Sequence, residues 1–173
     1  SHPQATWTSS AIKHLGGNRY RADGTLNLRG ASKPVPITFT LDIKGKDARA
    51  PVLLYLHGGI PDYFLTERYP TGLDEYFTVV WWERRGSGLS YHADAPPESA
   101  NAQQLVDDTL AVTDYLRKRF DQEKIYLIGR SGGTFIGLQA AAKAPHWYRA
   151  YIGVAQLTHQ LESERLAHEY MLR

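Results

Sequence analysis

The segment Gly129-Arg130-Ser131-Gly132-Gly133 is the part of this 173-residue chain whose residue types and spacing point most directly to chemistry. It fits the pattern Gly-x-Ser-x-Gly between an apolar run at 125–128 and an alanine-rich stretch. A sharp strand-to-helix turn needs small residues beside a serine if the hydroxyl is to be exposed at the strand's carboxyl end. The N-terminus of the helix would stabilise a developing anion, to which the Gly132 N–H could also donate. The pattern predicts nucleophilic catalysis by Ser131, against the plainer interpretation of a glycine-rich turn with an incidental serine.

A second candidate is Leu56-His57-Gly58-Gly59, at the end of another apolar run. Glycines at the end of a strand let a backbone N–H turn toward a nucleophile, and such a donor stabilises the oxyanion of acyl transfer. Taken alone, the segment is only a turn, and we interpret His57 as a structural residue rather than a base. The two segments together, in this chain order, strengthen the catalytic interpretation.

The elements that must position these segments follow from the pattern of apolar residues. Four short apolar runs predict strands, and Leu105, Val112, Leu116 and Phe120 recur at helical spacing between the second and third. A second helix is predicted at 134–143, and 157–173 has helical character. Alternating strands and helices imply parallel pairing with right-handed crossovers. The predicted strands lie at 52–56, 77–82, 125–128 and 150–155.

The first fifty residues have a different pattern. Apolar and polar residues alternate strictly over 35–43 and more weakly over 20–28, with turn-forming residues at 30–34. This predicts an antiparallel hairpin whose apolar face packs on helices. The expected fold class is therefore α/β: a mainly parallel sheet with flanking helices, preceded by an antiparallel N-terminal β-hairpin. A proline-containing loop is expected at 93–100.

Composition excludes several other classes. Hydrophobic residues make up 42% and charged residues 22%, which are ordinary globular values, and the net charge of +2 includes no basic block suited to nucleic acid. The absence of cysteine excludes a disulfide framework and a thiolate site. No apolar run approaches the roughly 20 residues that span a bilayer. Asp107, Asp108 and the glutamates after position 160 fit solvated helix faces, so neither a metal nor a nucleotide cofactor is implied.

Residues 44–173 resemble the α/β-hydrolases, specifically the branch similar to proline iminopeptidase. The segment 56–59 is similar to the family's oxyanion turn, and 129–133 to its nucleophile elbow. Between them, Trp82-Glu83-Arg84-Arg85-Gly86-Ser87-Gly88-Leu89-Ser90 is similar to its acidic-x-Arg-Gly-x-Gly-x-Ser turn. The resemblance implies that Ser131 is the nucleophile, that Gly132 and Gly59 donate to the oxyanion, and that a helical cap begins after Gln156.

The same resemblance shows where this sequence departs from the family. Arg130 stands where His or Glu is frequent, which could alter the local field or the substrate preference. The family's triad order is Ser, then Asp or Glu, then His, and only 42 residues follow Ser131. We interpret His146, His159 and His168 as noncatalytic. The resemblance thus implies a chain truncated before its acid and its base, and a serine without a base is weakly nucleophilic.

Residues 3–45 carry a second resemblance, to part of the lipocalin-like, polyisoprenoid-binding family. The similar segments include 5–10 and 17–26, but one hairpin and a leading strand cannot close a barrel around a lipid. Two incomplete families in one chain suggest a chimera, an engineered or recombined product, or part of something longer. We expect a β-rich segment at 1–45, a partial hydrolase core at 46–156 and the start of a helical cap at 157–173.

Two functional hypotheses remain open at this point. The first is a serine hydrolase that cleaves an ester or an N-terminal peptide bond through an acyl-enzyme on Ser131, with turnover dependent on completion of the triad. The second is a catalytically inactive fusion, with isoprenoid binding by the N-terminal segment as a minor possibility. Expected partners are a small-molecule or short-peptide substrate and further copies of the chain, since exposed sheet edges self-associate. The compartment is left open.

Overall fold

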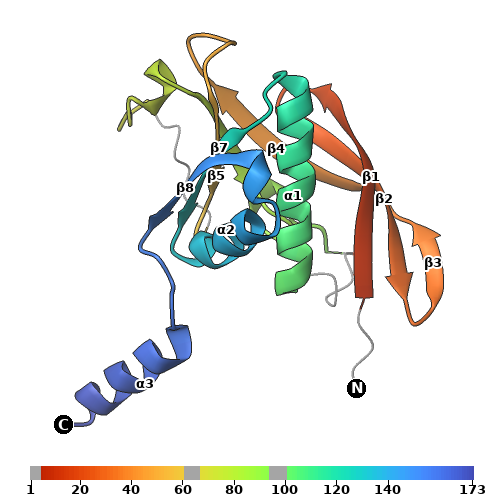
Figure 1. The fold of residues 1–173 in the computed structure, drawn as a ribbon. Helices are drawn as coiled ribbons and strands as arrows, with labels where there is room; N and C mark the ends of the chain where they lie inside the picture. The colour runs from red at the N-terminus through yellow and green to blue at the C-terminus, as the bar shows by residue number, and fades with distance from the viewer. Residues whose placement is uncertain (1–4, 61–66, 94–100) are drawn as a thin grey trace.

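The strands of this protein form a single mixed sheet across the whole described chain (Figure 1). A computed structural model describes residues 5–60, 67–93 and 101–173. Its eight described strands are ordered β1-β2-β4-β6-β5-β7-β8, with β3 paired to β2. Their bounds are β1 (Ala5–Gly16), β2 (Arg19–Leu28), β3 (Ala31–Pro34), β4 (Ile37–Lys44), β5 (Val52–Leu56), β6 (Thr78–Glu83), β7 (Ile125–Arg130) and β8 (Tyr148–Val154).

The sheet changes from antiparallel to parallel in its middle. Strands β1, β2 and β4 pair antiparallel, and β4 also pairs antiparallel with β6. Beyond that point β6, β5, β7 and β8 are mutually parallel, as the alternation of strands and helices predicts. The predicted fold class is confirmed, including the antiparallel hairpin of β2 and β4.

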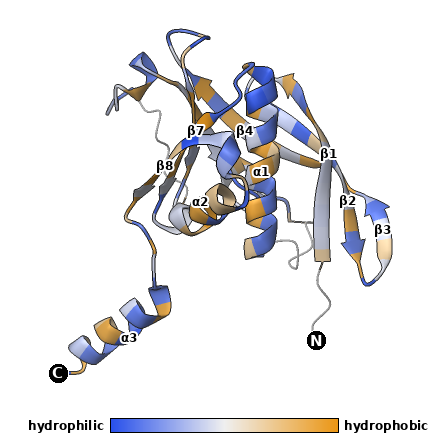
Figure 2. Ribbon diagram, in the orientation of Figure 1, coloured by the Kyte–Doolittle hydropathy of each residue, from blue (hydrophilic) through white to orange (hydrophobic). Residues whose placement is uncertain are grey.

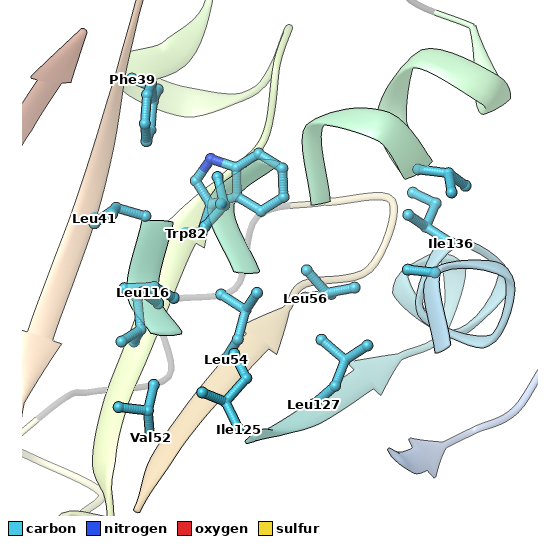
Figure 3. Close-up of a cluster of buried hydrophobic side chains, with 14 of the residues drawn as sticks. Phe39, Leu41, Val52, Leu54, Leu56, Trp82, Leu116, Ile125, Leu127 and Ile136 are labelled. Carbon is cyan, nitrogen blue, oxygen red and sulfur yellow. The ribbon is translucent and has the colours of Figure 1, made fainter. Parts of the chain in front are cut away.

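Strand β5 is buried on both faces, which explains its uninterrupted apolar sequence. Val52, Leu54 and Leu56 pack into the larger core cluster, whereas Leu53 and Tyr55 pack into a smaller one on the opposite face. Figure 3 shows Leu54 and Leu56 near Trp82 and Leu127 in the larger cluster.

Two helices cover the side of the sheet that holds this larger cluster. Helix α1 (Ala102–Arg119) begins after Asn101, whose side chain accepts a hydrogen bond of 2.9 Å from the Gln104 N–H. Helix α2 (Gly132–Lys143) follows β7 directly. Both helices contribute buried residues to the larger cluster: Val106, Val112, Leu116, Ile136 and Ala140.

The N-terminal strands pack against α1. Phe39 and Leu41 of β4 join the same cluster as the helix, as the alternation at 35–43 predicts. Trp7 of β1 is also buried there, and Gly24 leaves room for its indole, because a Cβ at Gly24 would overlap the ring. The segment 1–4 and the predicted loop residues 94–100 lie outside the described residues.

Three single-turn 3-10 helices and one further helix complete the described elements. The short turns are η1 (Leu73–Glu75), η2 (Gly88–Ser90) and η4 (Pro145–Trp147). Helix α3 (Gln160–Met171) stands away from the sheet and contains no buried residue (Figure 1). Figure 2 shows that it nevertheless carries hydrophobic segments. Within the described part of the chain, no helix combines the length and the apolar character needed to cross a bilayer.

Candidate active site

Ser131 occupies the turn between β7 and α2 in a strained backbone conformation. Its φ of 49° and ψ of −123° are sparsely populated by residues with a side chain. The residue is exposed and lies at the N-terminus of α2, where helix dipoles favour negative charge. Strain of this kind persists only where the surroundings impose it, and functional sites are where it clusters.

The glycines around Ser131 are sterically required. A Cβ at Gly129 would lie 2.8 Å from the carbonyl oxygen of Gly133. A Cβ at Gly133 would lie 2.6 Å from the carbonyl oxygen of His57 and closer still to that of Leu56. Both clashes are with backbone, which cannot move aside like a flexible side chain. The glycines of the Gly-x-Ser-x-Gly pattern therefore let the start of α2 approach the ends of β5 and β7.

Hydrogen bonds fix the Ser131 turn on both sides. The Ser131 N–H donates to the Val154 carbonyl at the end of β8, at 2.8 Å. The Ser131 carbonyl accepts from the Thr134 N–H at 2.8 Å and from the Thr134 hydroxyl at 2.6 Å. The serine backbone is thus held by the sheet and by the first turn of α2, and its side chain is not needed to hold it.

The Gly58–Gly59 turn after β5 lies directly against Ser131. A Cβ at Gly58 would lie 3.7 Å from the Ser131 Oγ, and a Cβ at Gly132 would lie 3.4 Å from the Gly59 nitrogen. The fold therefore brings together the three residues that the sequence singled out: Ser131, Gly132 and Gly59.

His57 is buried and belongs to the support of this turn. Its Nδ1 lies 2.8 Å from the Gly58 carbonyl oxygen, and its Nε2 lies 3.2 Å from the Ser87 hydroxyl. With the proton on Nδ1, the ring donates to Gly58 and keeps Nε2 as an acceptor. The interpretation of His57 as structural agrees with this geometry.

Arg84 is a residue of the site that sequence reasoning missed. It directly follows β6, is only 7% exposed, and donates from Nη2 to the carbonyl oxygens of His57 at 2.7 Å and Gly58 at 2.6 Å. It fills the variable position of the acidic-x-Arg-Gly turn, so the motif draws no attention to it. The available signal was a charged residue directly after an apolar strand that pairs with β5.

The neighbouring Arg85 pairs with Asp108, for which the sequence predicts a position on a solvated helix face. Its guanidinium forms two hydrogen bonds to Asp108, of 2.7 and 2.8 Å, and lies over the Trp7 ring at 4.9 Å. Asp108 is only 8% exposed, so the prediction that it lies on a solvated face is wrong. Helical periodicity cannot predict that a charged residue is buried by a partner from a turn distant in sequence. Asp107 is exposed, as expected.

The carboxylate of Glu83 organises the rest of this turn. It accepts hydrogen bonds from the Leu89 N–H at 2.6 Å and from the Thr40 hydroxyl at 3.0 Å. Gly88 has a φ of 51°, and a Cβ there would overlap the Glu83 carboxylate. The acidic and glycine residues of the motif thus stabilise the conformation of its backbone.

Acid–base groups are not gathered at the serine in the described structure. His146 lies on η4, His159 precedes α3 and His168 is on α3, and all three are exposed. Over residues 5–60, 67–93 and 101–173, no hydrogen bond joins an imidazole or a carboxylate to the Ser131 hydroxyl. Nor do the described residues include a group of three or more His, Asp or Glu that could hold a metal ion.

This chain is similar in sequence to a known family and to two characterised or probable hydrolytic enzymes. A family described as "Serine aminopeptidase, S33" matches residues 48–167. The chain is 35% identical over 133 residues to a probable aminopeptidase, YbaC, of Bacillus subtilis (strain 168). It is 28% identical over 127 residues to a 2-(acetamidomethylene)succinate hydrolase of Mesorhizobium japonicum. These matches cover 76% and 73% of this chain but 42% of each relative, so the chain spans less than half of their length.

Among solved structures, an epoxide hydrolase of Vigna radiata, VrEH1, superposes with a TM-score of 0.56 at 24% identity. The match covers 76% of this chain and 38% of that one. At this level of identity the likeness establishes the fold, which is part of an α/β-hydrolase.

Proposed function

The chain belongs to the serine aminopeptidase S33 family, and on this premise we propose that it is a serine hydrolase with Ser131 as its nucleophile. It would cleave an ester or an N-terminal peptide bond of a small-molecule or short-peptide substrate. The observation that carries the proposal is the juxtaposition of the strained, exposed Ser131 with the Gly58–Gly59 turn.

In the proposed mechanism the Ser131 Oγ attacks the substrate carbonyl carbon. The carbonyl oxygen becomes an oxyanion as the tetrahedral intermediate forms, and the N–H groups of Gly59 and Gly132 donate to it. Collapse of the intermediate expels the alcohol or amine and leaves an acyl-enzyme, which water then hydrolyses. The N-terminal end of α2 adds a favourable field at the oxyanion.

The proton of Ser131 needs a base, and the described residues place none beside it. We propose that the base and its orienting acid come from outside the described part of the chain or from a second chain. By itself, this chain is then expected to react slowly, because an unassisted serine hydroxyl is a weak nucleophile.

The test is labelling with a serine-reactive fluorophosphonate, read by intact-protein mass spectrometry. A single adduct is expected on the wild-type chain and on Ser163→Ala, which removes an exposed serine of α3. The adduct should be absent from Ser131→Ala. Equal labelling of Ser131→Ala would refute the assignment of the nucleophile, and complete absence of labelling would refute activation of Ser131 in this chain.

One observation favours the second hypothesis, a noncatalytic protein with lipid contact through its N-terminal strands. A crevice lies between these strands and α1. Its lining is mostly apolar and includes Trp7, Ile12, Ile37, Phe39 and Val112. Its cavity volume of about 30 Å³ is far below the roughly 300–1,000 Å³ of ligand pockets, so the crevice would have to open to take an isoprenoid. Native mass spectrometry showing an isoprenoid adduct, together with an unreactive Ser131, would favour this hypothesis over the hydrolase.

A further inference from the structure

We propose that Arg84 is a positioning residue, which fixes the Gly58–Gly59 peptide so that the Gly59 N–H faces Ser131. The inference rests on the proposed function, because the orientation of the Gly59 N–H affects catalysis only if this group donates to an oxyanion. It adds a residue that lies outside the fixed positions of the sequence motif and that is only 7% exposed.

The first step of the argument is the contact between Arg84 and the turn. One guanidinium nitrogen, Nη2, donates to two consecutive backbone carbonyls, those of His57 and Gly58, at 2.7 and 2.6 Å. The Arg84 backbone N–H and Nε both lie 3.4 Å from the His57 Nε2. Arg84 therefore holds the backbone and the imidazole of the same turn.

The second step is the geometry of a trans peptide, in which the C=O and the following N–H point in opposite directions. The structure contains no cis peptide bond among its described residues. When Arg84 holds the Gly58 carbonyl, the Gly59 N–H must point away from Arg84. The Gly59 nitrogen lies beside Gly132, so this orientation turns the N–H toward the Ser131 turn.

The third step is the freedom that this contact removes. Two consecutive glycines have no Cβ to restrict them, and a Cβ at Gly59 would meet nothing within 4 Å. A peptide between them could rotate with little steric hindrance. A donor that must reorient during reaction stabilises the transition state less than one that is already aligned. The Arg84 contact, together with the His57 Nδ1 on the same Gly58 carbonyl, supplies the alignment before substrate arrives.

Charge adds a second effect to orientation. Arginine keeps its positive charge at any ordinary pH, and hydrogen bonds from a charged donor are stronger than neutral ones. A cation on the Gly58 carbonyl oxygen also polarises the peptide, which makes the Gly59 N–H a better donor. Lysine could keep the charge at this position but could not reproduce the planar guanidinium fork.

The proposal is tested first by NMR of the full chain labelled with ¹³C,¹⁵N-glycine, because this readout needs no activity. Arg84→Met removes the donors, whereas Arg84→Lys keeps one charged donor. The control is Arg119→Met, which removes an exposed arginine of α1 that hydrogen-bonds Tyr20 of β2, away from the site. Thermal unfolding of each variant shows that it is folded.

In Arg84→Met we expect the Gly58 carbonyl and Gly59 amide signals to shift and to broaden or double, as a peptide that rotates would require. Arg84→Lys should restore part of the shift, and Arg119→Met should leave both signals in place. Unchanged Gly58 and Gly59 signals in a folded Arg84→Met variant would overturn the proposal.

Fluorophosphonate labelling provides the second arm. If Ser131 reacts in the wild-type chain, Arg84→Met should slow the reaction by about tenfold or more, since loss of an oxyanion donor reduces rates by about 10²–10³. Arg84→Lys should recover part of the rate. A rate within about twofold of wild type would contradict a positioning role. If the wild-type chain does not react, activation of Ser131 in this chain is refuted, and the NMR result still decides the role of Arg84.

Discussion

The side-chain amide of Gln104 on α1 hydrogen-bonds both backbone groups of Trp7 on β1. It accepts from the Trp7 N–H at 2.7 Å and donates to the Trp7 carbonyl at 2.9 Å. Trp7 lies on an outer strand of the sheet, whose outward backbone groups would otherwise be open to pairing. A helix side chain thus takes the place of a neighbouring strand and joins the N-terminal segment to the rest of the fold.

Gln104→Ala is therefore expected to destabilise the protein by about 1–3 kcal/mol, because two buried backbone groups lose their partner. Hydrogen exchange should show that the substitution accelerates amide exchange in β1 more than in β5. The control is Gln103→Ala, one residue away on the exposed side of α1, where the free energy of unfolding should change by less than about 0.5 kcal/mol. Equal effects of the two substitutions would contradict this account.

The buried Arg85–Asp108 pair gives a second expectation. Removing one partner of a buried ion pair costs about 3–5 kcal/mol, because the other charge stays buried and unpaired. Asp108→Leu should have an effect of this size on chemical denaturation. Asp107→Leu changes the adjacent, exposed carboxylate, which pairs with Lys143 at 3.3 Å, and should cost less than about 1 kcal/mol. The double variant Arg85→Met/Asp108→Leu should regain part of the stability.

Gly133 should not tolerate a side chain, for reasons independent of catalysis. Gly133→Ala places a methyl group against the carbonyl oxygens of Leu56 and His57, and we expect a loss of about 3 kcal/mol in the free energy of unfolding. Gly59→Ala has open space around its Cβ and should change stability by less than about 0.5 kcal/mol. A Gly133→Ala variant as stable as Gly59→Ala would show that the start of α2 can move away from β5.

Ionisation of Tyr148 is expected to lower the free energy of unfolding at alkaline pH. Burial raises the pKa of Tyr148 from its ordinary 10.0 to about 12, although the hydrogen bond with Thr113 opposes this. The unfolded chain therefore loses this proton first as the pH rises. The contribution is fully present below pH 10 and is lost between pH 10 and about 12, by an amount of about 3 kcal/mol.

Denaturant titrations of the wild type and of Tyr148→Phe on both sides of pH 10 measure this contribution. The stability of the phenylalanine variant should fall less steeply above pH 10, whatever its stability at neutral pH. Parallel pH profiles of the two proteins would exclude ionisation of Tyr148 as the cause.

Self-association is proposed from two exposed apolar surfaces. Ile152 and Val154 of β8 are exposed, as are Leu161, Tyr170 and Met171 of α3. Light scattering should show a dimer or a larger species, and Leu161→Glu/Tyr170→Glu should shift it toward the monomer. Ser163→Glu adds a charge at a polar position of the same helix and should leave the mass unchanged. A monomeric wild-type chain would refute the proposal.

Several elements could be predicted from sequence because their cause is local. The apolar run at 52–56 matches β5 in both bounds, and α1 contains the predicted helical repeat except for Phe120, which caps its C-terminus. The proximity of Ser131 and Gly59 could be predicted because turn residues at the ends of parallel strands meet at one edge of the sheet.

Other features depend on partners that are distant in sequence. Strand β1 has no regular alternation because its register shifts between Ser9 and Ala11, so Ile12 rather than Ala11 packs on the core. The expected turn at 30–34 is also partly wrong: Arg29 and Gly30 make the turn, and the following residues form β3. The positions of Arg84 and Asp108 depend on contacts with residues of other elements. The periodicity of apolar residues within one segment carries no information about such contacts.

The position of β5 between β6 and β7 has a consequence for how the chain is made. Strand β7 begins roughly 70 residues after β5 ends. At about 5–20 residues per second, synthesis leaves β5 without this neighbour for roughly 4–14 s. Because both faces of β5 are apolar, the strand exposes apolar side chains to water during that interval, whichever face is covered. Folding must wait for contacts between distant residues, so the newly made chain is most exposed to aggregation at the strand that later lies deepest.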